Sequence, residues 1–346
     1  MVFSNNKKNI FNKENLKIIF VGKLSLDIGS DRIFCQTFSS FLSTLKNCDV
    51  KLEEEITEKS ECDIAIFKKS YPFKNLKSIF DKNPNFLIGI INPSDKKKEK
   101  LKINLADFAI VGSIEEKAYY SKYLKCFIYP LLEDVNSDLI RSYDSRPQKV
   151  ICYHGNKQHL DYININIENA LLRLNKEGYT FKAVYNFRDL GKCKKPFITN
   201  HVQWDLKTRL QEIADSTVGI CPSTHYTGFL KNSIAKKIIG DNNIINDYLL
   251  QFKNNSNASR SFIFHQLKIP VIAEIGGSHH HILGDETAGF LCFSENSWYE
   301  SIKKLCNDQS LNISFAEKAY TLMSELYDPI LWSKRFLNEI KIWANQ

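Results

Sequence analysis

Short apolar segments alternate with helix-like segments along most of the chain, and this alternation limits the folds that are open to it. In the first half, apolar runs that bury both faces of a strand lie at residues 17–22, 63–67, 86–91, 106–113 and 126–130. Between the first two, Arg32 to Leu45 carries Phe34, Phe38 and Leu42 at helical spacing. Strands that are apolar on both faces and are separated by helices predict a parallel sheet covered by helices.

A second alternation follows a charged, aperiodic stretch at residues 133–148, which reads as a linker. Strands are expected at 149–155, 181–185 and 217–221, and helices at 167–176, 206–216, 258–267, 298–306 and 315–326. Residues 223–257 are polar and asparagine-rich, and this length predicts an insertion or a mobile functional segment. The 346 residues therefore predict two α/β domains, at 15–140 and 148–328.

The segment from Lys268 to Gly277 joins a helix to a short apolar strand that begins at Pro270 and ends in a glycine pair. A second apolar strand, Ala288 to Cys292, follows a polar loop. In such a layout the carboxyl ends of the strands stay open, and α/β sheets commonly hold a nucleotide there.

The order of these segments resembles that of glycosyltransferases with the GT-B architecture, most closely the family 4-like group. The resemblance is carried by residues 106–113 with Tyr129-Pro130, by 153–156, by 210–220 and by the Pro270 strand. The family often has two glutamates before that strand, and Asn257 and His265 stand at their positions here. The chain therefore resembles a divergent member.

The resemblance implies two Rossmann-like domains that face each other across a cleft, with a C-terminal helix at 329–346 that packs back on the first domain. It also implies a nucleotide sugar in the second domain and an acceptor in the first. Backbone amides, a helix N-terminus and basic side chains would stabilise the leaving diphosphate, so no metal or other cofactor is expected.

The donor-binding candidates lie at two chain turns and one helix start. A helix N-terminus attracts phosphate, and an arginine adds a two-pronged donor; alternatively, the arginine is solvated and the serines only cap the helix. A glycine after a buried strand lets a ligand approach the backbone. Alternatively, the segment is an ordinary strand-to-helix loop without a ligand. These donor candidates are His154, Gly155, Asn156, Lys157, Ser259, Arg260, Ser261, His265, Gly276 and Gly277.

The acceptor-side candidates lie in the loop after the first strand. Asp27 and Asp31 are candidate general bases, and Gly29, Ser30 and Arg32 are acceptor-side residues. Ser30 or Asp31 alternatively caps the helix that follows, and for Asp31 we favour the cap. No histidine precedes His154, so the first domain cannot supply a histidine base. Lys68, Lys69 and Asp95 also follow strands, and we expect them to be solvated.

Metal binding is not expected. His279, His280 and His281 are consecutive, so their side chains point in different directions and do not converge on one ion. An Asp-x-Asp motif, typical of metal-dependent GT-A enzymes, is also absent from the sequence.

The formal net charge of +8 divides equally between residues 1–147 and the remainder. Such a diffuse charge fits an anionic substrate or a peripheral contact with an anionic membrane better than specific nucleic-acid binding. Nine cysteines without a C-x-x-C pair indicate free thiols in a reducing compartment. The polar start of the chain and the lack of a long apolar run favour a cytoplasmic protein.

The function predicted from the resemblance is a metal-independent glycosyltransferase of the hexosyl type, acting in polysaccharide biosynthesis. It would move a sugar from a UDP- or GDP-linked donor to a glycan, a lipid-linked acceptor or another hydroxyl. Three alternatives stay open: a sugar-nucleotide 2-epimerase of the same fold, a non-catalytic GT-B binding module, and a DNA glucosyltransferase.

Overall fold

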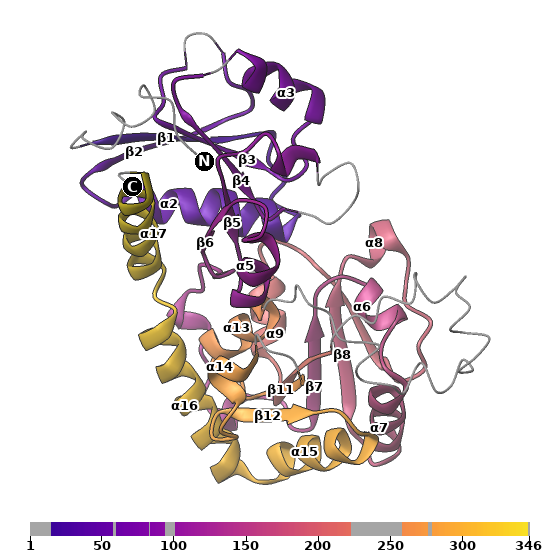
Figure 1. Ribbon diagram of the computed structural model, residues 1–346. Coiled ribbons are helices and arrows are strands. Elements are labelled where there is room, and N and C mark those ends of the chain that lie inside the picture. The colour runs from indigo at the N-terminus through magenta and orange to yellow at the C-terminus, as the bar shows by residue number, and fades with distance from the viewer. Residues whose placement is uncertain are drawn as a thin grey trace. The chain divides into compact units, whose positions relative to one another are not determined.

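The computed structural model describes residues 15–57, 60–82, 84–93, 101–222, 258–275 and 279–344. The predicted insertion at 223–257, together with Asp95, Gly276 and Gly277, lies outside these residues. The chain divides into two compact units, residues 1–134 with 327–346 (unit 1) and residues 135–326 (unit 2). Each is described by itself (Figure 1).

Within the described residues, unit 1 is built on a six-stranded parallel sheet with the order β2-β1-β3-β4-β5-β6. Its strands are β1 (Leu16–Val21), β2 (Cys48–Glu53), β3 (Ile64–Lys68), β4 (Leu87–Ile91), β5 (Phe108–Val111) and β6 (Lys125–Ile128). Its helices are η2 (Asp31–Thr37), which is π-helical, α2 (Phe38–Ser43), α3 (Phe73–Asp81), α5 (Ile114–Tyr120) and α17 (Pro329–Ala344), with the short 3₁₀ turns η3 (Ser137–Leu139) and η4 (Tyr143–Ser145) in the segment that opens unit 2.

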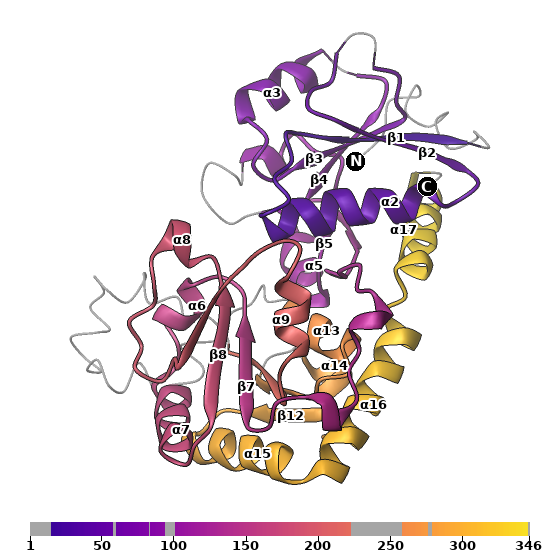
Figure 2. The same cartoon turned by 180° about the vertical axis from the view of Figure 1, so that it is seen from behind.

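Both faces of this sheet are buried, as the apolar strands predict. One face packs against η2, α2 and the C-terminal helix α17, and the other packs against side chains of α3 and α5. Phe38 of α2 stacks on Tyr129 with ring centroids 3.7 Å apart, and Phe336 of α17 meets Phe38 edge-on at 5.3 Å. Figures 1 and 2 show α17 beside α2. The C-terminal helix is thus part of the core of unit 1.

Unit 2 repeats the plan with a second six-stranded parallel sheet, ordered β12-β11-β10-β7-β8-β9 among the described residues. Its strands are β7 (Val150–His154), β8 (Thr180–Tyr185), β9 (Asn200–Gln203), β10 (Val218–Cys221), β11 (Val271–Glu274) and β12 (Gly289–Cys292). Its helices are α6 (Gln158–Asp161), α7 (Ile165–Lys176), α8 (Phe187–Leu190), α9 (Arg209–Ala214), α13 (Ser259–Gln266), α14 (His280–Leu283), α15 (Glu295–Asn307) and α16 (Gln309–Leu326).

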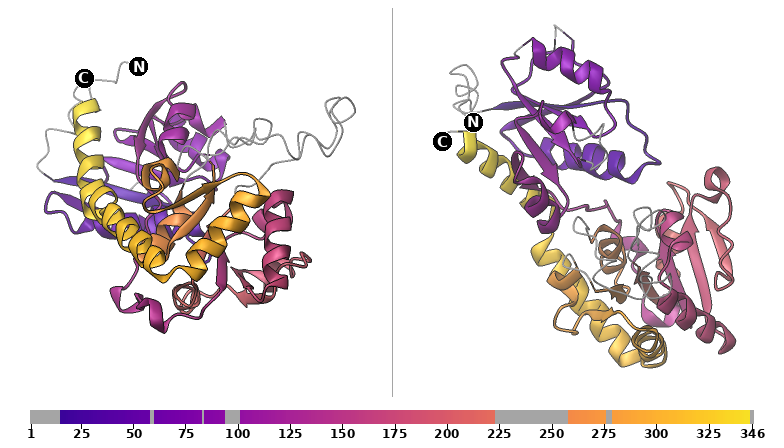
Figure 3. Two further views of the ribbon diagram at one scale, coloured as in Figure 1. Left: turned by 90° about the horizontal axis from the view of Figure 1, so that it is seen from below. Right: turned by 45° about the vertical axis from the view of Figure 1, so that its right-hand side comes forward.

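Helices cover both faces of the second sheet. Helices α7 and α15 lie side by side over one face, around the buried Trp298 (Figure 3). Helix α13 packs on β10 and β11 on the other face, where Gly219 leaves room for the ring of Phe264: a Cβ at Gly219 would come within 2.5 Å of that ring. The predicted fold class, α/β with two Rossmann-like parallel sheets, is confirmed.

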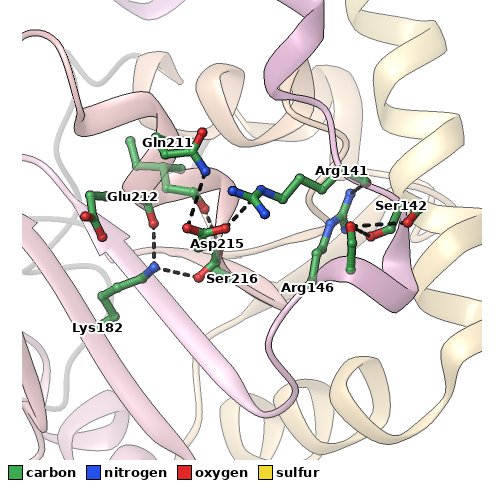
Figure 4. A network of polar contacts seen from close by, with 10 residues as sticks. Arg141, Ser142, Arg146, Lys182, Gln211, Glu212, Asp215 and Ser216 are labelled. Carbon is green, nitrogen blue, oxygen red and sulfur yellow. Dashed lines mark hydrogen bonds and ion pairs between the residues drawn. The ribbon is translucent and has the colours of Figure 1, made fainter.

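The predicted linker forms an ion pair with another segment of unit 2. Arg141 forms a 2.9 Å ion pair with Asp215, just after α9 (Figure 4). Nearby, the buried Lys182 of β8 donates its ammonium protons to the main-chain carbonyls of Glu212 and Asp215. A cation at the end of α9 satisfies carbonyls that the helix leaves without partners.

No helix among the described residues combines the length and the apolarity that crossing a bilayer demands.

Candidate functional site

The donor-side candidates come together at the carboxyl edge of the unit 2 sheet. The loop after β7 reaches the start of α13 there: the His154 ring Nε2 lies 2.9 Å from the main-chain oxygen of Arg260, and the same ring meets Phe264 edge-on at 5.0 Å. Gly155 has φ +139°, and a Cβ there would lie 2.8 Å from the Tyr153 hydroxyl and 3.1 Å from Arg260 Cδ. Glycine at 155 therefore permits the close approach of Arg260 to this loop.

Arg260 is held by one hydrogen bond and keeps donors to spare. Its Nη2 donates to the Pro222 carbonyl at 2.7 Å, and its guanidinium lies 5.8 Å from the centre of the Tyr153 ring. Its Nη1 is buried and has no hydrogen-bond partner among the described residues. A buried donor without a partner costs about 1–3 kcal/mol, so a ligand that accepts a hydrogen bond from this atom would recover part of that cost.

Two buried histidines extend this group of unpartnered atoms. His265 is fully buried, and neither ring nitrogen has a partner within the described part of the chain. His279, next to α14, is 7% exposed, and its Nδ1 is likewise without a described partner. Burial, followed by the charge of His279, lowers the pKa of His265 to about 3; burial, followed by the charge of Arg260, lowers the pKa of His279 to about 3. Both rings are therefore neutral at pH 7.

The remaining donor-side candidates have local partners. Tyr153 donates its hydroxyl proton to the Asn156 carbonyl at 2.7 Å, and Lys157 donates to the Leu190 carbonyl at 2.9 Å. Ser261 donates to the Ala258 carbonyl at 2.7 Å, and Ala258 is the N-cap of α13 without a side-chain cap bond. Neither serine therefore caps this helix, which contradicts the alternative considered above. Ser259 is half-buried in the first turn.

The acceptor-side candidates lie in unit 1, where the structure pairs them in a way that the sequence did not predict. Asp31 is buried, and its carboxylate accepts from Lys68 Nζ at 2.8 Å and from Ser25 N at 3.2 Å. The expectation that Asp31 caps its helix is wrong: Ser30 occupies the N-cap position, without a side-chain cap bond. Lys68 was expected to be solvated, but its side chain is only 12% exposed.

Arg32 is engaged as well. Its Nε donates to Glu133 Oε2 at 3.1 Å, its Nη2 pairs with Glu133 Oε1, and its Nη1 donates to the Leu26 carbonyl at 2.8 Å. Glu133, expected in a linker, is instead buried. The two ion pairs hold the loop at residues 23–30, while Asp27 within it is exposed and Gly29 and Ser30 are half-buried. Of the two candidate bases, only Asp27 presents its carboxylate to solvent.

Of the two partners, Lys68 had a signal in the sequence and Glu133 did not. Lys68 ends a strand at the same edge as the loop after β1, and Gly22, with φ +133°, leaves room for its stem: a Cβ there would lie 2.8 Å from Lys68 Cγ. Glu133 follows Arg32 by 101 residues, and nothing local in the sequence links the two. Among the described residues, no three His, Cys, Asp or Glu side chains are grouped to hold a metal ion.

No family model and no curated protein matches the sequence. The structure of the chain, however, matches solved structures. A TarM mutant of S. aureus, in complex with Fondaparinux, alpha-GlcNAc-glycerol and UDP, is 14% identical with a TM-score of 0.54; the match covers 80% of this chain and 54% of TarM. The chain thus spans about half the length of TarM.

Two further structures match almost from end to end. An alpha-glucosyltransferase in complex with UDP and a mismatched 13-mer DNA is 12% identical with a TM-score of 0.63, over 94% of this chain and 100% of that one. HepE of Anabaena in complex with UDP-glucose is 11% identical with a TM-score of 0.63, over 94% and 99%. The predicted resemblance to GT-B glycosyltransferases is therefore confirmed at the level of the fold.

Proposed function

We propose that the protein is a glycosyltransferase that takes a sugar from a UDP-sugar and transfers it to a hydroxyl acceptor without a metal ion. The observation that carries this proposal is Arg260 in the first turn of α13, whose buried Nη1 has no partner among the described residues. The buried rings of His265, in the last turn of the same helix, and of His279, before α14, add nitrogens without described partners. A guanidinium and a helix N-terminus at a sheet edge suit a diphosphate. The choice of UDP rests on the structural neighbours, whose complexes contain UDP or UDP-glucose.

In the reaction, the bond between the sugar anomeric carbon and the diphosphate oxygen breaks, and a bond to the acceptor oxygen forms. Negative charge grows on the leaving diphosphate, where Arg260 and the positive end of α13 would stabilise it. The acceptor proton must pass to a base, and Asp27 is the candidate in unit 1 with an exposed carboxylate. We assign a hexosyl donor, such as UDP-glucose, and a cytoplasmic site of action as parts of the same proposal.

The test begins with thermal unfolding of the full chain in the presence of UDP, GDP, ADP, CMP and dTDP. A ligand that binds only the folded state raises the melting temperature, and we expect UDP to give the largest increase. Arg260→Ala should remove the increase and leave the unliganded melting temperature nearly unchanged, since it loses one surface-edge hydrogen bond to Pro222. Arg173→Ala, which removes a half-buried arginine of α7 that pairs with Glu295 in the same unit, is the matched control.

A second measurement separates the enzyme classes. Release of UDP from UDP-glucose that depends on an added acceptor supports transfer, and conversion of the donor sugar without an acceptor supports the epimerase. The absence of any nucleotide-dependent shift would rule out both readings and leave the binding module.

A further inference from the structure

The positive charge of the second half of the chain is concentrated in one segment. Residues 186–209 contain six lysines or arginines and two aspartates, a formal excess of four. Residues 148–346 as a whole also have an excess of four, so the rest of the second half is neutral on balance. The charge that looks diffuse when halves are compared is therefore local within unit 2. We call residues 186–209 the basic crossover, because they run from β8 through the edge strand β9 to α9.

The two acidic side chains of the basic crossover are used locally. Asp189 accepts from Asn186 Nδ2 at 2.7 Å, and Asp205 accepts from the main-chain nitrogens of Lys207 and Thr208 at 2.9 and 3.3 Å. Gln203 of β9 binds the start of α8, since its Oε1 accepts from the Arg188 main-chain nitrogen at 3.0 Å. Hydrogen bonds between polar groups of the basic crossover thus stabilise its own conformation.

Most of the cations of the basic crossover face solvent. Arg209 is buried and donates to the Leu206 carbonyl, and Lys195 pairs with Glu168. The other four are exposed and form no ion pair with any residue that the structure describes; they are Arg188, Lys192, Lys194 and Lys207. Four exposed cations within one segment give it a local positive charge, which favours an anionic partner.

The basic crossover adjoins the candidate donor loop. Lys157, directly after the Gly155 turn, donates to the Leu190 carbonyl at 2.9 Å and so ties the two segments together. Helices α6 and α8 both lie beyond the carboxyl ends of β7 and β8, as Figures 1 and 2 show. A molecule bound along the exposed cations would therefore lie at the same sheet edge as Arg260.

We propose that the basic crossover binds an anionic glycan and holds it as the acceptor chain; the acceptor role rests on the proposed transferase function. Single-stranded nucleic acid fits this surface less well, because binding of single strands relies on free aromatic faces. Phe187 packs against Tyr185 at 5.9 Å and lies below Lys192 at 5.4 Å, while Trp204 is half-buried with Arg209 5.6 Å from its ring centre. The surface thus offers spaced cations without stacking platforms.

The test uses a fluorescent heparin-derived octasaccharide as the probe and full-length protein. The double charge reversal Arg188→Glu with Lys192→Glu is compared with Lys176→Glu and Lys318→Glu, two exposed lysines of unit 2 outside the crossover. Both variants change the net charge equally. We expect the crossover reversal to weaken binding by about tenfold or more and the control by about twofold or less, with an affinity that falls as salt rises.

Equal losses in the two variants would overturn the proposal, because binding would then follow net charge alone. Tighter binding of a single-stranded oligothymidylate of equal charge would overturn the choice of a glycan. The UDP-induced rise in melting temperature is measured on the same variants. If it persists while no octasaccharide binds, this inference fails and the proposed transferase stands; if octasaccharide binds but UDP has no effect, the proposed transferase fails.

Discussion

The buried ion pair between Arg32 and Glu133 gives the sharpest test of how unit 1 holds its loop. The side chains are 10% and 2% exposed, and two hydrogen bonds join the guanidinium to the carboxylate. Glu133→Gln keeps the shape of the side chain and removes its charge. Arg32 then stays buried and loses the charged partner with which it forms two hydrogen bonds, although its bond to the Leu26 carbonyl remains.

Loss of one partner of a buried pair costs about 3–5 kcal/mol, whereas an exposed pair is worth at most about 1 kcal/mol. We therefore expect Glu133→Gln to lower the stability of unit 1 by about 3 kcal/mol, a large part of the 5–15 kcal/mol typical of a domain. Replacing both charges, as Arg32→Met with Glu133→Leu, should recover most of that loss, because an apolar pair of similar volume often substitutes for a buried ion pair.

Native-state hydrogen exchange of the β1 amides reports the opening of unit 1 without requiring the whole chain to unfold in one step. The matched surface variant is Lys77→Met, which breaks the ion pair between Lys77 and Asp81. These two side chains are 52% and 54% exposed, so the free energy of opening measured by exchange should change by about 0.5 kcal/mol or less. A loss below about 1 kcal/mol for Glu133→Gln, or a double variant no more stable than the single one, would contradict the buried pairing.

Two further predictions concern unit 2. Gly155→Ala should abolish the UDP-induced rise in melting temperature, because its Cβ would crowd Tyr153 and Arg260. Gly178→Ala also places a side chain at a positive φ, of 84°, but has open space around it, so it carries backbone strain without the crowding and should keep the UDP effect. Loss of the effect in both variants would attribute it to backbone strain rather than to Arg260. The lowered pKa values of His265 and His279, about 3 each against 6.5 when unfolded, mean that the unfolded state binds more protons between these values. Stability should therefore be fully present above pH 6.5 and fall by about 1.4 kcal/mol per pH unit for each ring as the pH drops toward 3. Urea unfolding at pH 7 and pH 5 measures this change, which His265→Asn should reduce and the exposed control His281→Asn should leave intact; an unchanged slope in His265→Asn would refute the assignment.

The strands that the sequence predicted are those with an apolar run, including the edge strands β6 and β12, which are only partly buried. The other two edge strands, β2 (Cys48–Glu53) and β9 (Asn200–Gln203), were not predicted: all of their residues are half-buried or exposed, and neither forms an apolar run. Polar edges protect a sheet from pairing with other chains. The same property removes the signal by which an edge strand is recognised.

The sequence indicated candidate residues in both units, but it did not indicate their partners in unit 1. Arg260 and the Gly155 turn could be named as candidates because a glycine after a strand and a helix start are local patterns, and the structure brings the two together. The partners of Asp31 and Arg32 were not, since Lys68 and Glu133 lie 37 and 101 residues further along the chain. Periodicity shows which face of an element is buried, but not which charge on another element meets it there.

The contrast between the two sheet edges bears on how the proposed chemistry would be divided. In unit 1 the buried charges Asp31, Lys68, Arg32 and Glu133 neutralise one another, so they stiffen a loop and leave little charge for a ligand. In unit 2 the buried donors of Arg260 and His279 have no described partner, and a neutral imidazole at position 265 stands where the resemblance implies a glutamate. A carboxylate there would oppose a nearby diphosphate, whereas a neutral ring can donate a hydrogen bond without adding negative charge. Preorganised donors cost little to reorient when charge develops on a leaving group. Under the proposed function, the edge of unit 2 is thus the one that would receive the anion.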